Sequence, residues 1–350
     1  MADCFTGGLT DRLMLNLIIQ RIPGLRIQEK NMLSQKFENM ADFLALSVKD
    51  IEAIVKRQLN REKWTMEKIK IQAESDYKTA KRQGIKIVSV HDPDYPPLLR
   101  EIYDPPSVLF YRGVLPNPEI PLVAMVGTRK PSSAAVAKAY ELGRDLGRFG
   151  IPVVSGLALG IDAFSHRGNI DAGAPSVAVL GSGLDQIYPS SNRQLALRIL
   201  KGGGALISEY PPEMGPRKWH FPARNRIISA LARGTIIVEA PKKSGALITA
   251  EFALDQDRDL WVSSVGLNID RESGTAKLAL DGAKVINSSR EILEEWGLPC
   301  DGFSRGGQPE NTDTGFGGNF DNFDNIEGSV MGASLASSLA RTLEMELRGM

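Results

Sequence analysis

The pattern of apolar and polar residues changes character along the chain. From about residue 10 to residue 80, apolar residues recur at helical spacing, and Pro23 and Gly24 interrupt them as a turn would. After that stretch the apolar residues gather in short runs separated by longer amphipathic segments. The pattern therefore predicts a small all-helical domain at residues 1–80 and a domain of a different kind at residues 81–298.

The second stretch alternates as a doubly wound α/β domain does. After a first strand expected from Ile85, strands are predicted at 122–126, 151–155, 175–180, 205–208, 235–240 and 260–265. Helices are predicted between them at about 134–149, 162–173, 190–202, 223–233 and 246–257. Strands this apolar are buried on both faces, which is typical of a parallel sheet covered by helices on either side. We therefore expect a Rossmann-like, doubly wound, mostly parallel sheet.

The composition changes again after Cys300. Residues 299–328 are rich in Gly, Asn and Asp, so we expect a flexible linker without a core of its own. Helical periodicity returns at residues 329–350, where a short C-terminal helix is predicted. Residues 301–350 hold three basic and eight acidic side chains.

The overall composition is that of an ordinary globular protein, with 42% hydrophobic and 24% charged residues and a net charge of zero. No apolar run approaches the ~18 residues that a membrane span requires, and the N-terminus lacks the features of a secretion signal. Cys4 and Cys300 lie far apart in the sequence, so no disulfide framework is expected. These features predict a cytoplasmic protein without a membrane partner.

Small residues gather where predicted strands lead into helices. In doubly wound sheets, ligands bind beyond the carboxyl ends of the strands. Four loops there, at 127–133, 155–162, 181–185 and 241–249, place Gly, Ser or Thr near helix N-termini, which favours phosphate. The candidate phosphate contacts are Gly127, Thr128, Arg129, Ser132, Ser155, Gly156, Gly160, Ser244, Gly245 and Thr249. Taken singly, such a loop is more often just a tight turn; four together, one with Arg129 and one with Lys242 and Lys243, favour a phosphate site.

A basic strip at residues 216–234 contains five Lys or Arg residues and no acid. Its aromatic residues Trp219, His220 and Phe221 stand beside basic ones. Aromatic faces stack on unpaired bases while basic side chains follow the phosphates, so the strip predicts binding to single-stranded DNA. The candidate DNA contacts are Lys218, Phe221, Arg224 and Arg226. The alternative is that the aromatic residues belong to the core and the arginines bond carboxylates.

Other chemistries find little support. The segment GSGLDQ at 181–186 lacks the third glycine of a dinucleotide fingerprint, and no Walker A sequence is present. The three histidines are scattered without HExxH or CxxC, and no GxSxG elbow occurs. His166 could contact a ligand or pack in the core, and Asp162 is interpreted as a helix N-cap. We therefore predict no catalytic residue, no metal and no cofactor.

Seven motifs together resemble a known family. In order along the chain they are VAMVGTRKPS, VVSGLALGIDAFSHRG, VAVLGSGLDQIYPSSN, LISEYPP, FPARNRIISAL, IIVEA and SGALITAEFAL. This series, over about residues 85–290, resembles the DprA/Smf family of DNA-processing proteins, and the helical segment before it is similar to that family's sterile-alpha-motif-like domain.

The resemblance implies a homodimer that binds and shields single-stranded DNA during natural transformation or recombination. It also implies that the protein helps to load the recombinase RecA and has no catalytic activity. By motif position, Arg129, Lys218 and Phe221 correspond to the family's DNA-contacting pocket.

The chain departs from the family pattern in three places. The common GSR reads GTR at 127–129, and the usual AVPG reads SSVG at 263–266. Many relatives end in a winged-helix domain, of which residues 329–350 would be a remnant. A second function remains open, that of a nucleotide-processing phosphoribohydrolase-like enzyme, because SGALITAE at 244–251 loosely echoes the GT-x-x-E loop of such enzymes.

Overall fold

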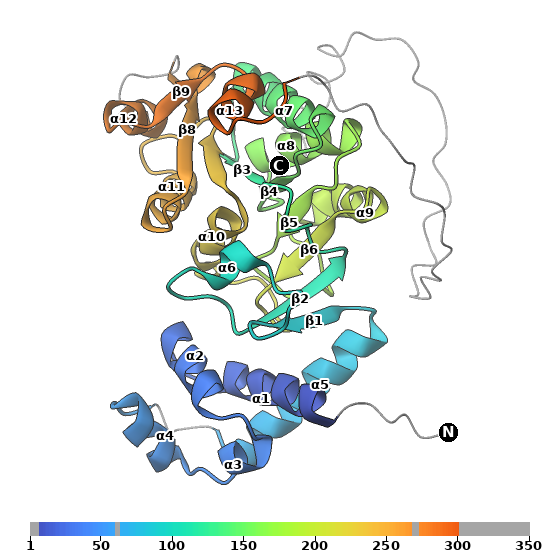
Figure 1. The fold of residues 1–350 in the computed structure, drawn as a ribbon, viewed down its shortest axis with the longest axis vertical. Coiled ribbons are helices and arrows are strands. Elements are labelled where there is room, and N and C mark those ends of the chain that lie inside the picture. The colour runs from blue at the N-terminus through green and yellow to red at the C-terminus, as the bar shows by residue number, and fades with distance from the viewer. Residues whose placement is uncertain (1–6, 60–63, 268–272, 301–350) are drawn as a thin grey trace.

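The computed structural model describes residues 7–59, 64–267 and 273–300. The first part is helical (Figure 1), and its helices are α1 (Gly7–Arg21), α2 (Ile27–Lys36), α3 (Met40–Leu44), α4 (Val48–Val55) and α5 (Met66–Arg82). Side chains of Asn39, Ser47 and Thr65 accept backbone N–H groups at the starts of α3, α4 and α5, as N-caps do. The predicted linker from residue 301 on and the predicted helix at 329–350 lie outside the described residues.

The second part is built on one sheet. Its strands are β1 (Lys86–Ser89), β2 (Val108–Gly113), β3 (Val123–Val126), β4 (Val153–Ser155), β5 (Val177–Val179), β6 (Ala205–Ser208), β7 (Gly234–Ile237), β8 (Asp259–Ser263) and β9 (Lys284–Ile286). Their order across the sheet is β1-β2-β6-β5-β4-β3-β7-β8-β9. The β1–β2 and β2–β6 pairs are antiparallel, and the pairs from β6 to β9 are parallel. The prediction of a doubly wound, mostly parallel sheet is confirmed.

Helices cover both faces of the sheet. On one face lie α7 (Ser133–Arg148), α8 (Ile161–Asp171), α9 (Arg193–Lys201) and α13 (Ser289–Glu295). On the other face lie α6 (Pro97–Arg100), α10 (His220–Leu231), α11 (Gly245–Asp255) and α12 (Gly274–Leu280). Every residue of β3 to β7 is consequently buried, which explains why these strands read as unbroken apolar runs.

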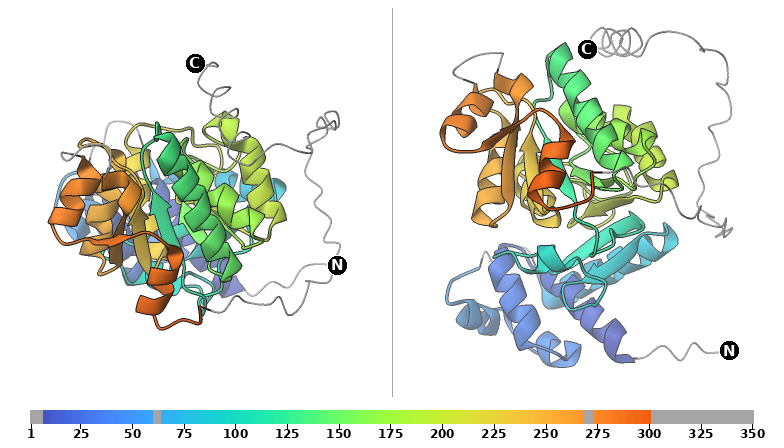
Figure 2. Two further views of the ribbon diagram at one scale, coloured as in Figure 1. Left: turned by 90° about the horizontal axis from the view of Figure 1, so that it is seen from above. Right: turned by 45° about the horizontal axis from the view of Figure 1, so that its top comes forward.

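The helical part packs against the sheet at its β1–β2 end (Figure 2). Apolar side chains of α1 share one buried cluster with Phe110 of β2 and Leu206 of β6. Asn16 of α1 donates a buried hydrogen bond of 2.7 Å to the Ser89 hydroxyl. The two parts are therefore joined by both apolar and polar contacts.

No helix in the part of the chain that the structure describes is both long and apolar enough to cross a membrane.

The strand order reverses beside β3. From β3 the chain moves outward through β4, β5 and β6 on one side, and later through β7, β8 and β9 on the other. The loops that leave β3 and β7 therefore diverge above neighbouring strands, and a crevice opens between them. Ligands of doubly wound proteins bind at such a point.

Candidate functional site

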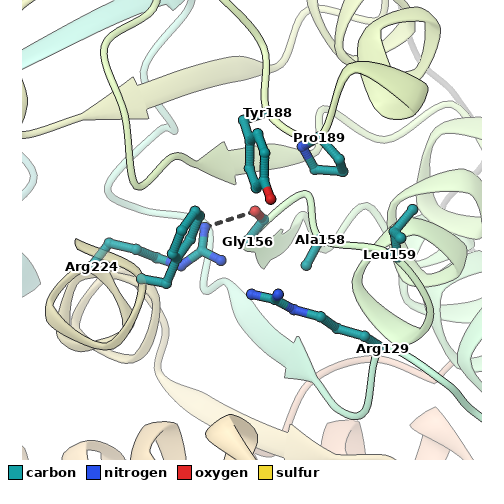
Figure 3. Close-up of a pocket in the computed structure, with 8 residues that line it drawn as sticks. Arg129, Gly156, Ala158, Leu159, Tyr188, Pro189 and Arg224 are labelled. Carbon is teal, nitrogen blue, oxygen red and sulfur yellow. Dashed lines mark hydrogen bonds between the residues drawn. The ribbon is translucent and has the colours of Figure 1, made fainter. Parts of the chain in front are cut away.

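A cleft of about 670 Å³ opens where the strand order reverses. Its walls are the loop after β3, the first turns of α10 and the loop from β7 into α11. Its charged lining residues are Arg129, Asp162, Lys218, Arg224 and Lys243. A smaller hollow of about 50 Å³ adjoins it and adds Gly156, Leu159 and Pro189 to the lining (Figure 3).

Arg129 reaches into this space from the loop after β3 (Figure 3). The residue is exposed, and its guanidinium carbon lies 5.6 Å from the centre of the Phe221 ring. Thr128 holds the base of the loop, because its amide donates to the Glu239 carbonyl at 2.8 Å. Gly160 has a φ of +75°, and a Cβ there would lie 2.4 Å from the Thr128 carbonyl oxygen. The glycine thus lets two loops touch beneath Arg129.

Two of the predicted phosphate loops are filled by carboxylates of the protein itself. The Asp162 carboxylate accepts the amides of Gly156 at 3.1 Å and Ala158 at 3.3 Å. The Glu239 carboxylate accepts the amide and, at 2.7 Å, the hydroxyl of Ser132. The expectation that these amides cradle a phosphate is therefore corrected. Asp162 is the second residue of α8, and Gly160 rather than Asp162 stands at the N-cap.

Serine side chains of these loops also bond internally. Ser132 caps α7 by accepting the Ala135 amide, and the buried Ser155 hydroxyl donates to the Met125 carbonyl at 2.6 Å. Neither serine lines the cleft. The structure therefore gives Ser132 and Ser155 roles in holding the loops together, in place of the predicted phosphate contacts.

The loop after β5 also lies elsewhere. The Gly183 amide donates to the Met214 carbonyl at 2.7 Å, and a Cβ on Gly183 would lie 1.9 Å from the Pro212 carbonyl oxygen. Residues 181–185 of this loop are packed against the segment after β6 and do not line the cleft. Gly183 serves a tight backbone contact instead of a phosphate, and a Cβ on Gly181 would lie 2.9 Å from the Phe221 ring.

Arg224 forms the floor of the site. Its side chain is buried, and the guanidinium donates to the backbone carbonyl of Gly156 at 2.7 Å (Figure 3). It also donates to the backbone carbonyl of Val179. The pKa of Arg224 is lowered to about 10, chiefly by burial; Asp162 opposes this shift and Arg129 adds to it. The group remains a cation at neutral pH. Nη1 is used on these two carbonyls and Nε donates to the Asn225 side chain, so Arg224 braces the loops and also adds positive potential to the site.

Arg226 points into the interior. It is 2% exposed and forms ion pairs with Glu209, from Nη2 to Oε2 at 2.7 Å, and with Asp104, from Nε to Oδ2 at 3.1 Å. It does not line the cleft. The predicted DNA contact is therefore corrected, and for this arginine the alternative of carboxylate bonding holds.

The aromatic residues of the strip divide between surface and interior. His220 is buried, and its ring stacks on Tyr210 with centroids 3.9 Å apart. Trp219 is 66% exposed, and Phe221 is half-buried at the edge of the cleft. The Phe221 ring lies 5.5 Å from the ring of Tyr188, an exposed residue that the sequence reasoning missed. The signal for Tyr188 was an aromatic residue beside a glycine-rich strand end, in the motif GSGLDQIYPSSN.

The third wall combines a helix N-terminus with a lysine. Ser244 caps α11, its hydroxyl accepting the Ala246 amide at 3.3 Å, and Gly245 begins the helix with open space where a Cβ would stand. Lys243 is exposed beside them. Thr249, one turn further, is buried in the lining with its hydroxyl lacking a hydrogen-bond partner among the described residues.

The structure therefore brings together most of the predicted contacts. Those lining one or both hollows are Gly127, Thr128, Arg129, Gly156, Lys218, Phe221, Arg224, Ser244, Gly245 and Thr249. Gly160, Ser132, Ser155 and Arg226 lie outside the lining.

His166 is buried, its Nδ1 lies 2.7 Å from the Ser176 hydroxyl, and burial lowers its pKa to about 3. It belongs to the core. The described residues hold no cluster of acidic, histidine and cysteine side chains suited to a metal ion.

Known proteins match the sheet domain that carries the cleft. The family model of DNA recombination-mediator protein A matches residues 86–297. DNA processing protein DprA of Bacillus subtilis is 42% identical over 216 residues, which is 61% of this chain and 72% of the relative. Protein Smf of Borreliella burgdorferi is 32% identical over 276 residues, covering 79% of this chain and 86% of the relative.

Two solved structures agree with these matches. DprA from Streptococcus pneumoniae superposes with a TM-score of 0.65 and 32% identity, covering 83% of this chain and 98% of that protein. DNA processing protein A from Helicobacter pylori, for which a single-stranded DNA binding mode is described, has a TM-score of 0.53 and 28% identity, covering 61% and 95%. Because the family model spans more than half of the chain, the protein belongs to the DprA/Smf family of DNA-processing proteins.

Proposed function

We propose that this protein binds single-stranded DNA in the cleft between the β3 and β7 loops. One observation carries the proposal: the exposed cations Arg129, Lys218 and Lys243 come from three different segments to one cleft that also presents the Phe221 and Tyr188 rings. Cations along a groove follow a phosphate backbone, and aromatic faces stack on bases of any sequence. The described binding mode of the Helicobacter pylori relative supports the same ligand.

The aromatic faces favour a single strand over a duplex. The faces of bases are accessible only when the bases are unstacked. An aromatic ring at the edge of a cleft can stack on the face of such a base. The Phe221 ring lies near both the Tyr188 ring and the Arg129 guanidinium. A planar arginine fork also matches phosphate oxygens. Phosphate and base recognition therefore meet around one ring.

The lining supports binding more than catalysis. Within the described residues, Asp162 is the one carboxylate in the lining, and it is bonded to backbone amides beside Arg224. Glu251, the acid of the phosphoribohydrolase-like echo, is exposed outside the lining. A carboxylate that acts as general acid or base must be able to reach the substrate. We propose that the protein acts by holding DNA.

We extend the proposal to a cytoplasmic homodimer that shields processed or incoming single strands and helps to load RecA during transformation or recombination. Membership of the DprA/Smf family supports this extension. Its test is the rate of RecA filament formation on single strands already coated with single-strand-binding protein. The protein is expected to raise that rate, and an unchanged rate would contradict RecA loading without affecting the DNA-binding proposal.

Binding should favour single strands and weaken with salt. Each neutralised phosphate of a single strand contributes about −0.7 to the slope of log K against log salt, so three to four cleft cations give about −2 to −3. Filter binding or fluorescence anisotropy at several salt concentrations measures the slope, with a duplex of the same sequence as control. A slope near zero, or tighter binding to the duplex, would contradict the proposal.

Phe221→Ala should weaken binding by about 1–3 kcal/mol, the contribution of one stacked base. The half-exposed ring lies at the edge of the cleft, so the melting temperature should change little. Phe221→Tyr, which keeps an aromatic face, is the matched control and should bind like the parent. If the alanine variant binds normally but melts much earlier, the ring is part of the core and not a DNA contact.

A further inference from the structure

A second aromatic group stands on the rim of the cleft. Of the protein's four tryptophans, Trp64, Trp261 and Trp296 are at most 9% exposed, whereas Trp219 is 66% exposed. The guanidinium carbon of Arg217 lies 5.7 Å from the centre of the Trp219 indole. We call Arg217 and Trp219 the rim platform.

The rim platform sits on a fixed turn. The His220 amide donates to the Arg217 carbonyl at 2.9 Å, which closes a turn of four residues. The His220 ring is clamped between the Tyr210 ring, on which it stacks, and the Gly181 carbonyl, which lies 3.1 Å from its Nδ1. The Trp219 indole meets this buried ring edge-on, with centroids 6.0 Å apart at 85°. The indole is therefore placed by an anchored neighbour and is not a loose surface side chain.

Neighbouring residues of this turn face different surfaces. Lys218 lines the cleft, whereas Arg217 and Trp219 do not and instead contact each other. The basic strip at 216–234 contains no acid, so nothing within it repels a phosphate backbone that leaves the cleft past Lys218. Inside the cleft, Phe221 is paired with Arg129. Outside it, the exposed Trp219 indole is paired with Arg217 in the same way.

We propose that the rim platform binds the same single strand immediately outside the cleft, with a base stacked on Trp219 and a phosphate at Arg217. This inference rests on the proposed function and extends the binding path beyond the cleft. Stacking on an indole does not depend on base identity. The platform therefore lengthens the DNA site without adding sequence preference.

The exposed tryptophan provides its own signal. Because the other three tryptophans are buried, a change of indole fluorescence on adding oligodeoxythymidine reports on Trp219. We expect quenching in the parent, and loss of that quenching in Trp219→Phe, which keeps an aromatic face and should still bind. An unchanged emission of the parent at saturating oligonucleotide would overturn the inference.

Binding measurements on alanine variants test how much Trp219 contributes to DNA affinity. Trp219→Ala should weaken binding of an oligonucleotide of about 20 nucleotides at least fivefold, the lower end for a stacked base, and leave an oligonucleotide of about three nucleotides unaffected. Tyr103→Ala is the matched control, because Tyr103 is an aromatic residue that is 86% exposed outside the cleft lining. The melting temperature of each variant shows whether the fold is retained.

The outcomes separate this inference from the function on which it rests. If Arg129→Ala binds weakly and Trp219→Ala binds like the parent at both lengths, the rim platform is wrong and the cleft stands. If both variants bind like the parent, the cleft itself is wrong and the platform falls with it. Equal loss of both oligonucleotides in a folded Trp219→Ala would place the indole in the cleft and also overturn the platform.

Discussion

Arg226→Ala should lower the free energy of unfolding by about 3–5 kcal/mol, the cost of breaking a buried ion pair from one side. The substitution leaves the buried Glu209 carboxylate, and in part Asp104, without a counter-charge. Burial alone would lower the pKa of Arg226, but the two carboxylates outweigh it and hold the pKa above its usual value. Chemical denaturation, with the midpoint and slope measured separately, tests this expectation.

The matched comparison is Arg129→Ala, which removes an exposed arginine and should leave the unfolding midpoint nearly unchanged. Pairing Arg226→Met with Glu209→Gln should recover part of the lost stability, because no unpaired charge then remains at Glu209. A folded Arg226→Ala that melts like the parent but no longer binds DNA would show that this arginine leaves its carboxylates to meet a phosphate.

Arg129→Ala should weaken binding to single-stranded DNA by about 1.5–3 kcal/mol, the range for hydrogen bonds to charged groups. The structure gives Arg129 no carboxylate partner among the described residues, so its guanidinium is available for phosphate. Arg129→Lys keeps the charge but not the planar fork, and should recover only part of the loss. Anisotropy titrations of folded variants measure the difference.

The double variant with Lys218→Ala adds a geometric test. Losses should be close to additive if the two side chains bind separate phosphates more than ~7–10 Å apart, and less than additive if they share one. A folded Arg129→Ala that binds DNA like the parent would move the site away from the β3 loop.

Local pattern was sufficient for the central strands of this fold and the helices between them, but it did not predict α6, α12, β9 or α13. The central strands are apolar throughout because both of their faces are covered, and the sequence displays that burial directly. The helix predicted at 223–233 instead begins at His220, because Pro222 sits in its first turn, where a missing amide proton costs nothing. The sequence also predicted that Gly127, Arg129 and Ser244 lie at one edge of the sheet. Each follows a parallel strand, and the carboxyl ends of parallel strands share that edge.

The sequence pattern could not predict which charged and polar side chains pair with each other. Arg226 meets Asp104 across 122 residues, and Ser132 meets Glu239 across 107. Nothing local distinguishes an arginine that will find a buried carboxylate from one that will face solvent. The sequence prediction therefore counted both Arg226 and Lys218 as DNA contacts, although Arg226 is buried and Lys218 is exposed. Tyr188 escaped notice for a related reason, because its partner Phe221 is distant in the sequence and near only in the folded chain.

The contact between Gly156 and Arg224 limits how this site can evolve. A Cβ on Gly156 would lie 2.2 Å from Nη2 of Arg224, and the same guanidinium donates to the Gly156 carbonyl. A mutation of either position alone meets a penalty, since Gly156→Ala would bring a methyl group into collision with the arginine and a shorter side chain at position 224 would leave the carbonyl unpaired. Substitutions at the two positions are therefore expected to be inherited together. Lineages that lose the glycine should be those that have also lost the arginine.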